Sequence, residues 1–301
     1  MLIVFLFVLL LQVPPLDSLK EKERSSRGQL KNPATCAGFN YLYINSSKAR
    51  HLTMLHHQPL LFIFVNFICN ANMGGKFYLG KFFCWRTLKK NKMNLIIFGA
   101  TGTVGKQLVQ QALFNGDHVK AFSRNVYTTD YLQTENLQLV QGALFDESEV
   151  YNAIKGCDAV LSAIGGGADG TDKTRTLGIK NIIKQMQKAG VKRIIAIGGL
   201  GVLQADENSL LLDKDDYPPE YKAVGFEHKK AFELLNESNL NWTFVCPPNI
   251  INEGPTGSFV TNADYPPEPN TYKINAGDLS MFMLNELTKN EFINHRVGIS
   301  N

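Results

Sequence analysis

The segment Asn94–Gly105, Asn-Leu-Ile-Ile-Phe-Gly-Ala-Thr-Gly-Thr-Val-Gly, restricts the possible folds of this chain more than any other. Its apolar run Leu95–Phe98 is typical of a parallel strand that is buried on both faces. Of the glycines that follow, Gly99 permits a tight turn, Gly102 lets the backbone approach a diphosphate, and Gly105 lets a helix pack close to the sheet. The first N–H groups of that helix would face the phosphates. A strand, these glycines and a helix in this order predict a dinucleotide site.

Apolar runs alternate with amphipathic helical segments along residues 93–301. This alternation predicts an α/β fold: a single Rossmann-type, doubly wound parallel sheet with helices on both faces. The cofactor would lie across the carboxyl ends of the strands, where the strand order reverses. The polar loop Gln204–Asp216 is a candidate lid, and Asp278 is expected to cap a helix over Leu279–Leu287. We expect strands at Leu95–Phe98, His118–Phe122, Leu137–Gln141, Ala159–Ile164, Ile194–Ile197, Trp242–Cys246 and Arg296–Ile299.

The charge is divided unevenly between two parts of the chain. Residues 1–92 hold 13 Lys and Arg against 3 Asp and Glu, whereas residues 93–301 hold 18 against 24. The excess of basic residues therefore belongs to the leader, and the mildly acidic remainder argues against nucleic acid as a partner. The five cysteines show no paired spacing of the metal-binding or redox type, so we expect no metal site and a reducing, cytoplasmic compartment.

The leader, residues 1–92, allows three interpretations. Its apolar run Leu2–Leu11 is too short to span a bilayer and lacks the basic start of a secretory signal. A signal or anchor would place the domain outside the cytosol or on a membrane, and a transit peptide would explain the basic composition but not the apolar start. We favour the third interpretation, in which Met93 is the true start, residues 93–301 form the complete cofactor-binding domain, and the leader, if made, is mostly disordered.

The end of the second strand indicates which cofactor is preferred. An NAD-selective site usually has an acidic residue here to hold the ribose hydroxyls, but this chain has Ser123-Arg124-Asn125. Because a guanidinium suits a 2′-phosphate, Arg124 favours NADP(H) over NAD(H). The alternative is that Arg124 is an ordinary solvated loop arginine.

Taken together, six motifs resemble the atypical short-chain dehydrogenase/reductase group. More narrowly, the chain is similar to the NAD(P)H-binding proteins that include biliverdin reductase B (flavin reductase) and NmrA-like regulators. The likeness covers residues 93–301, and its last three motifs together are more specific than the first. The motifs are Gly99–Gly105, Ala121–Asn125, Val160–Gly165, Leu234–Trp242, Pro247–Ile250 and Pro255–Gly257.

The resemblance implies that NADPH binds along the first glycine motif, Arg124 and the loop after the fourth strand, with the nicotinamide facing the fifth and sixth strands. In the reductase branch it implies hydride delivery to flavins or related planar acceptors. The implied cofactor contacts are Gly99, Thr101, Gly102, Thr103, Val104, Arg124, Ala163, Ile164, Gly165, Gly198, Gly199 and Pro247.

Two positions depart from the reductase pattern. The flavin and biliverdin reductases carry a serine where this chain has Gly199, and a histidine where it has Asn249. Hydride transfer to a flavin can still proceed, because the nicotinamide carries the chemistry and solvent can supply the proton. Reduction of a carbonyl is harder to support, since a developing alkoxide requires a positioned acid.

Three residues are candidates for contacting the substrate. Tyr221 could donate a hydrogen bond from the start of a helix, and Asn249 follows two prolines at the end of the sixth strand. His228 could titrate near neutral pH, but it lies on the apolar stripe of its helix, and this position favours a partly buried structural role over a catalytic one.

The sequence therefore predicts an NADPH-dependent oxidoreductase that reduces a flavin-like, quinone-like or small carbonyl acceptor. The alternative is an NmrA-like regulator that senses NADP(H) without turnover. We expect a small-molecule substrate as the partner, a monomer or homodimer, and no membrane association unless the leader is genuine.

Overall fold

The computed structural model describes residues 61–66, 81–86, 92–167 and 169–301. The chain divides into two units, Met1–Lys90 and Asn91–Asn301. In the first unit, β1 (Leu61–Asn66) pairs antiparallel with β2 (Lys81–Arg86). The other expectations for the leader, including its apolar start and its disorder, lie outside the described residues.

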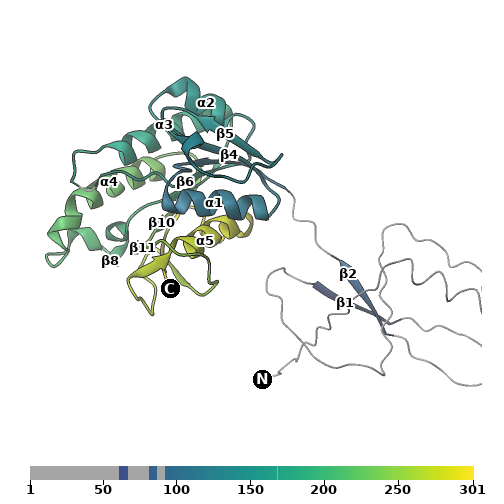
Figure 1. Ribbon diagram of the computed structural model, residues 1–301. Coiled ribbons are helices and arrows are strands. Elements are labelled where there is room, and N and C mark those ends of the chain that lie inside the picture. The colour runs from purple at the N-terminus through teal and green to yellow at the C-terminus, as the bar shows by residue number, and fades with distance from the viewer. Residues whose placement is uncertain (1–60, 67–80, 87–91, 168) are drawn as a thin grey trace, which may run out of the picture. The chain divides into compact units, whose positions relative to one another are not determined.

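The second unit is built on an eight-stranded sheet with the order β12-β14-β10-β7-β6-β3-β4-β5 (Figure 1). The chain enters at the centre with β3, moves outward through β4 and β5, and then crosses back to β6 on the other side of β3. This reversal between β3 and β6 is the switch point of a doubly wound sheet. The strands are β3 (Asn94–Phe98), β4 (His118–Ser123), β5 (Leu137–Gln141), β6 (Ala159–Ser162), β7 (Arg193–Ile197), β10 (Asn241–Cys246), β12 (Val260–Ala263) and β14 (His295–Ser300).

Helices cover both faces of this sheet. Along β3, Leu95 and Ile97 pack in the core that α1 and α5 share, whereas Ile96 and Phe98 pack in the core beneath α2, α3 and α4. Successive side chains of a strand point to opposite faces, so an uninterrupted apolar strand supplies both cores. The helices are α1 (Thr103–Phe114), α2 (Glu147–Ile154), α3 (Thr174–Ala189), α4 (Pro219–Asn236) and α5 (Ala276–Lys289).

The prediction of a doubly wound α/β sheet is confirmed, with three local differences. The edge strand β12 runs antiparallel to β14, so the sheet is mostly rather than wholly parallel. The loop Gln204–Asp216 contains a short hairpin of β8 (Gln204–Asp206) and β9 (Ser209–Leu210). The prediction for Asp278 is wrong, because α5 begins at Ala276 with Asn275 as its N-cap. The buried Asp278 carboxylate instead accepts the N–H groups of Thr256 and Gly257, both at 2.7 Å.

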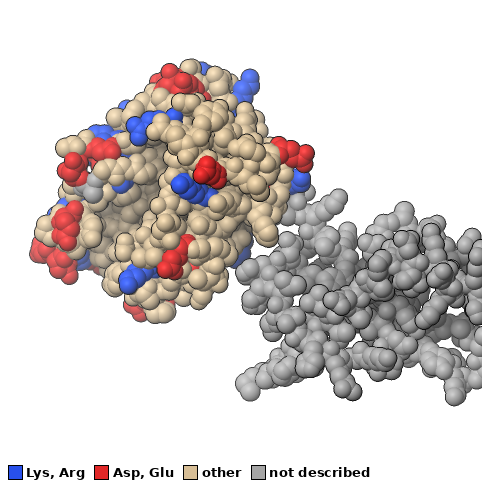
Figure 2. All heavy atoms as spheres, in the orientation of Figure 1, with Lys and Arg blue, Asp and Glu red and all other residues tan. Residues whose placement is uncertain are grey.

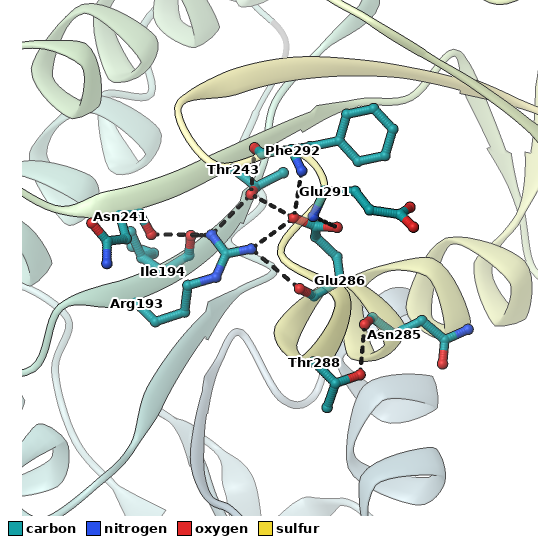
Figure 3. Close-up of polar contacts among 9 residues, drawn as sticks. All are labelled: Arg193, Ile194, Asn241, Thr243, Asn285, Glu286, Thr288, Glu291 and Phe292. Carbon is teal, nitrogen blue, oxygen red and sulfur yellow. Dashed lines mark hydrogen bonds and ion pairs between the residues drawn. The ribbon is translucent and has the colours of Figure 1, made fainter.

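A buried ion pair ties α5 to the amino ends of β7 and β10 (Figure 3). Arg193 Nη2 lies 3.0 Å from Glu286 Oε1, and Arg193 Nη1 donates to Thr243 Oγ1 at 2.9 Å. Glu286 also accepts the N–H groups of Glu291 and Phe292. Buried charges are tolerated only when they are paired and hydrogen-bonded in this way. The network lies at the opposite end of β7 from its carboxyl edge, so its role is to hold the fold together.

Two further features are reported for the described residues alone. None of their helices combines the length and the apolar character that a membrane span requires. Their His, Cys, Asp and Glu side chains form no group that could hold a metal ion. Figure 2 shows one face of the second unit, where basic side chains are scattered among acidic ones.

Candidate functional site

A pocket of about 310 Å³ lies at the carboxyl ends of the central strands, next to the switch point. Its walls come from the segments that follow β3, β4, β5 and β6, so four strand ends converge on one space. The volume is within the usual range for small-molecule sites. The lining residues are Gly99, Thr101, Gly102, Phe122, Ser123, Arg124, Gly142, Ala143, Leu144, Phe145, Ala163, Ile164, Gly165 and Thr174.

The three glycines of the first motif have different structural roles. Gly99 has a φ of +75°, and a Cβ there would lie 2.3 Å from the carbonyl oxygen of Ala163. A Cβ on Gly105 would lie 2.1 Å from the carbonyl oxygen of Gly99, so this glycine permits the close approach of α1. A Cβ on Gly102 would meet only the Gly99 oxygen, at 3.4 Å. The space in front of Gly102 is therefore open to a ligand rather than filled by the protein.

The first turn of α1 offers hydrogen-bond donors at this open space. Gly102 is the N-cap of α1, its own N–H donates to the Gly99 oxygen at 3.0 Å, and no acidic side chain occurs in the first turn. The next three N–H groups, those of Thr103, Val104 and Gly105, have no acceptor within the helix, and the first intrahelical bond is donated by Lys106 to the Gly102 oxygen at 2.9 Å. The turn Gly99–Gly102 and the first residues of α1 together form what we call the glycine corner. Because these N–H groups and the helix dipole favour anions, the glycine corner fits a diphosphate.

Arg124 supplies positive charge on the second wall of the pocket. It follows the last residue of β4, its side chain is exposed, and no described residue forms an ion pair or hydrogen bond with its guanidinium. The neighbouring Ser123 hydroxyl lies 3.0 Å from Thr101 Oγ1, which connects this wall to the glycine motif. A free guanidinium at this strand end fits a 2′-phosphate.

The loop after β6 is held by charged residues that sequence reasoning did not identify. Arg175 donates from Nη2 to the Gly166 oxygen at 2.9 Å and from Nη1 to the Gly167 oxygen at 2.8 Å. Asp172 accepts the Gly167 N–H at 2.7 Å. Hydrogen bonds from Thr174 and from this N–H lower the pKa of Asp172 to about 2, so its carboxylate remains charged. These contacts can be seen only in the folded loop, because neither Arg175 nor Asp172 belongs to a recognisable motif.

His228, on α4, lies next to Gly199 beyond the carboxyl end of β7. A Cβ on Gly199, which follows β7, would lie 2.7 Å from the His228 ring. His228 Nδ1 is buried and has no hydrogen-bond partner among the described residues. Burial, and then the positive charge of Arg175, lowers the pKa of His228 to about 3. At neutral pH this imidazole is therefore uncharged, and it can donate or accept a hydrogen bond but cannot supply a proton as an imidazolium.

The structure separates the predicted residues into two groups. Seven of the implied cofactor contacts line the pocket, while Thr103, Val104, Gly198, Gly199 and Pro247 lie outside its lining. Tyr221 in the first turn of α4 is 55% exposed, and Asn249 is exposed at the start of β11 (Asn249–Ile251), which pairs with β13 (Lys273–Asn275). Tyr221, His228 and Asn249 are likewise absent from the pocket wall.

Residues 142–145 are the main part of the pocket wall that the sequence did not indicate. They follow β5, and Phe145 is 56% exposed although it lines the pocket. Alternation of strands predicts where β5 ends, but not which side chains of the following loop turn toward the switch point.

A family model described as NAD(P)H-binding matches residues 99–290. A crystal structure of a candidate NADH-flavin reductase from Streptococcus pneumoniae is 27% identical, with a TM-score of 0.58, covering 69% of this chain and 99% of that one. A candidate exported protein from Burkholderia pseudomallei is 30% identical, with a TM-score of 0.61, covering 69% and 100%. The uncharacterised protein YwnB of Bacillus subtilis is 26% identical over 215 residues, 69% of this chain and 98% of YwnB.

Proposed function

This chain belongs to the NAD(P)H-binding family, and from that premise we propose that it is an NADPH-dependent oxidoreductase that passes a hydride to a flavin-like, quinone-like or small carbonyl acceptor. The single observation that carries the proposal is the pocket at the switch point, which joins an open glycine corner to an unpaired guanidinium. We further propose that residues 93–301 form the cofactor-binding domain, and that it works in the cytosol, where its two described cysteines, both free and buried, would stay reduced.

In this proposal the chain binds and orients the cofactor. The N–H groups at the start of α1 hold the diphosphate, and Arg124 holds the 2′-phosphate. The loop Ala163–Gly165 contacts the part of NADPH that leads from the diphosphate to the nicotinamide. When bound, NADPH supplies the hydride. The remaining implied contacts, Gly198, Gly199 and Pro247, follow the ends of β7 and β10, where the acceptor would meet the nicotinamide.

The acceptor end of the site favours planar redox compounds over simple carbonyls. The uncharged His228 cannot deliver a proton as an imidazolium, and Asn249 carries no ionisable group. Of the three proposed acceptor contacts, Tyr221 alone carries a hydroxyl, and it is exposed. Reduced flavins and quinones can take their protons from water, whereas a developing alkoxide requires a positioned acid. The resemblance to a candidate NADH-flavin reductase supports the same class of acceptor.

The same observations favour one alternative, a regulator of the NmrA kind that binds NADP(H) without turnover. With Gly199 and Asn249, this chain lacks two proton donors that the reductase pattern has on the acceptor side, while seven of the implied cofactor contacts line the pocket. A sensor would need the pocket but not the donors.

NADPH oxidation by the full chain, followed at 340 nm with FMN, FAD, quinones and aldehydes in turn, tests the proposal. Calorimetric titration with NADPH is run on the same preparation. Turnover with flavins or quinones supports the reductase, and turnover with aldehydes alone would contradict the reasoning about proton donors. Binding without turnover across the panel would favour the sensor, and absence of binding would refute both.

A further inference from the structure

Tyr131 is a buried tyrosine that neither the sequence motifs nor the proposed cofactor contacts include. Its side chain is 7% exposed and packs in the core shared by α1 and α5. Its hydroxyl donates a hydrogen bond of 2.5 Å to the carbonyl oxygen of Ala100, which lies between Gly99 and Thr101. Burial raises the pKa of Tyr131 to about 12, so the hydroxyl keeps its proton and remains a donor.

This hydrogen bond sets the orientation of a peptide group in the glycine corner. In a planar trans peptide, the C=O of Ala100 and the N–H of Thr101 point in opposite directions. Tyr131 therefore holds the Thr101 N–H on the side of the chain away from itself. Thr101 lines the pocket, and no described residue accepts a hydrogen bond from its N–H. The buried Ala100 carbonyl would be left without a partner if the tyrosine hydroxyl were removed.

Tyr131 also closes the segment that carries Arg124. After Arg124 the chain runs through the buried Val126 and the short helical turn Val126–Thr128, and it returns to the core at Tyr131. Two more bonds cross between this segment's start and the glycine corner. The Ala100 N–H donates to the Phe122 oxygen at 3.3 Å, and the Thr101 and Ser123 hydroxyls lie 3.0 Å apart. The corner and the Arg124 segment are thus joined at both ends of the segment.

We propose that Tyr131 is a positioning residue that, with the Thr101–Ser123 hydrogen bond, holds the diphosphate corner and Arg124 in one geometry. This inference rests on the proposed function. Its consequence is that the two recognition events are coupled: loosening Tyr131 weakens the grip on the diphosphate, which NADH and NADPH share, and also displaces Arg124, which only NADPH uses.

Calorimetric titration of the full chain with NADPH and NADH tests this coupling in Tyr131→Phe. Loss of about one hydrogen bond to the diphosphate should weaken the binding of both cofactors about threefold. Loss of a further bond from Arg124 should bring the total weakening of NADPH binding to about tenfold, so that the preference for NADPH falls about threefold. The matched control is Tyr127→Phe in the same segment, because Tyr127 is 66% exposed and no described residue bonds to its hydroxyl. This control should leave both affinities unchanged.

A purely structural role for Tyr131 would weaken both cofactors equally, and that result, or no change in either, overturns the proposal. In Arg124→Ala, adding Tyr131→Phe should lower the cofactor preference no further. Should Tyr131→Phe fail to fold, Ser123→Ala decides, since it removes the other hydrogen bond from a half-buried position; an unchanged preference there refutes the coupling. Failure of the wild-type chain to bind either cofactor would instead refute the proposed function.

Discussion

Replacing Arg124 by alanine should remove the preference for NADPH while leaving NADH affinity nearly unchanged. The guanidinium lines the pocket and has no ion pair with any described residue, so its loss breaks no contact within the protein. A hydrogen bond to a charged group contributes about 1.5–3 kcal/mol. Because the Arg124 side chain is exposed and screened by water and salt, the lower end of that range applies. We therefore expect about a tenfold loss of NADPH affinity, or about 1.4 kcal/mol.

Titration with NADPH and NADH at two ionic strengths measures this effect. The wild-type preference should shrink as salt rises, because the contact is between exposed charges, and the preference of Arg124→Ala should not respond to salt. Lys180→Ala, which removes an exposed cation on α3, controls for the general loss of positive charge. Equal affinities in the wild type, or an unchanged ratio in Arg124→Ala, would show that Arg124 does not contact the phosphate.

Three further predictions concern stability and the acceptor side. Glu286→Gln should destabilise the fold by about 3–5 kcal/mol in urea unfolding because it leaves Arg193 buried without a counter-charge; Glu291→Gln, at a position 56% exposed, should change stability by less than about 0.5 kcal/mol. The lowered pKa of His228, about 3 against 6.5 in the unfolded chain, makes its contribution to stability complete above about pH 6.5 and progressively lost as pH falls toward 3. At pH 4.5 that loss should be roughly 2.5 kcal/mol, and it should be absent in His228→Leu once each protein is compared with itself at pH 7. Gly199→Ser places a Cβ 2.7 Å from the His228 ring, so the variant should lower the melting temperature, whereas Gly165→Ala, where a Cβ meets nothing within 4 Å, should leave it unchanged.

Much of the fold could be predicted because its signals are local. A strand that reads Leu-Ile-Ile-Phe must be buried on both faces, and the glycines after it permit the turn and the helix contact that the structure shows. Strand–helix alternation then restricts the topology to a doubly wound sheet. The pocket position followed from the same reasoning, since the carboxyl ends of β3, β4 and β6 meet where the chain reverses direction.

The remaining features depend on contacts between residues far apart in the chain. The residues next to Asp278 in the sequence predict that it caps a helix, but its carboxylate accepts a hydrogen bond from the Thr256 N–H and so holds that loop. His228 lies on an apolar stripe, and only its packing against Gly199 and the charge of Arg175 show why it is uncharged.

The sequence by itself determined the α/β sheet, the glycine corner and the cation beside it, because strand burial, turn geometry and residue type at a strand end act over a few neighbouring residues. Only the tertiary structure decided which groups are buried, paired or left free. The protonation of His228, the Arg175 contacts to the loop and the bond from Tyr131 to Ala100 each join segments that sequence spacing cannot relate. Their physical cause is desolvation. A polar group that the chain has enclosed requires a hydrogen-bond partner, and an enclosed titratable group changes its pKa.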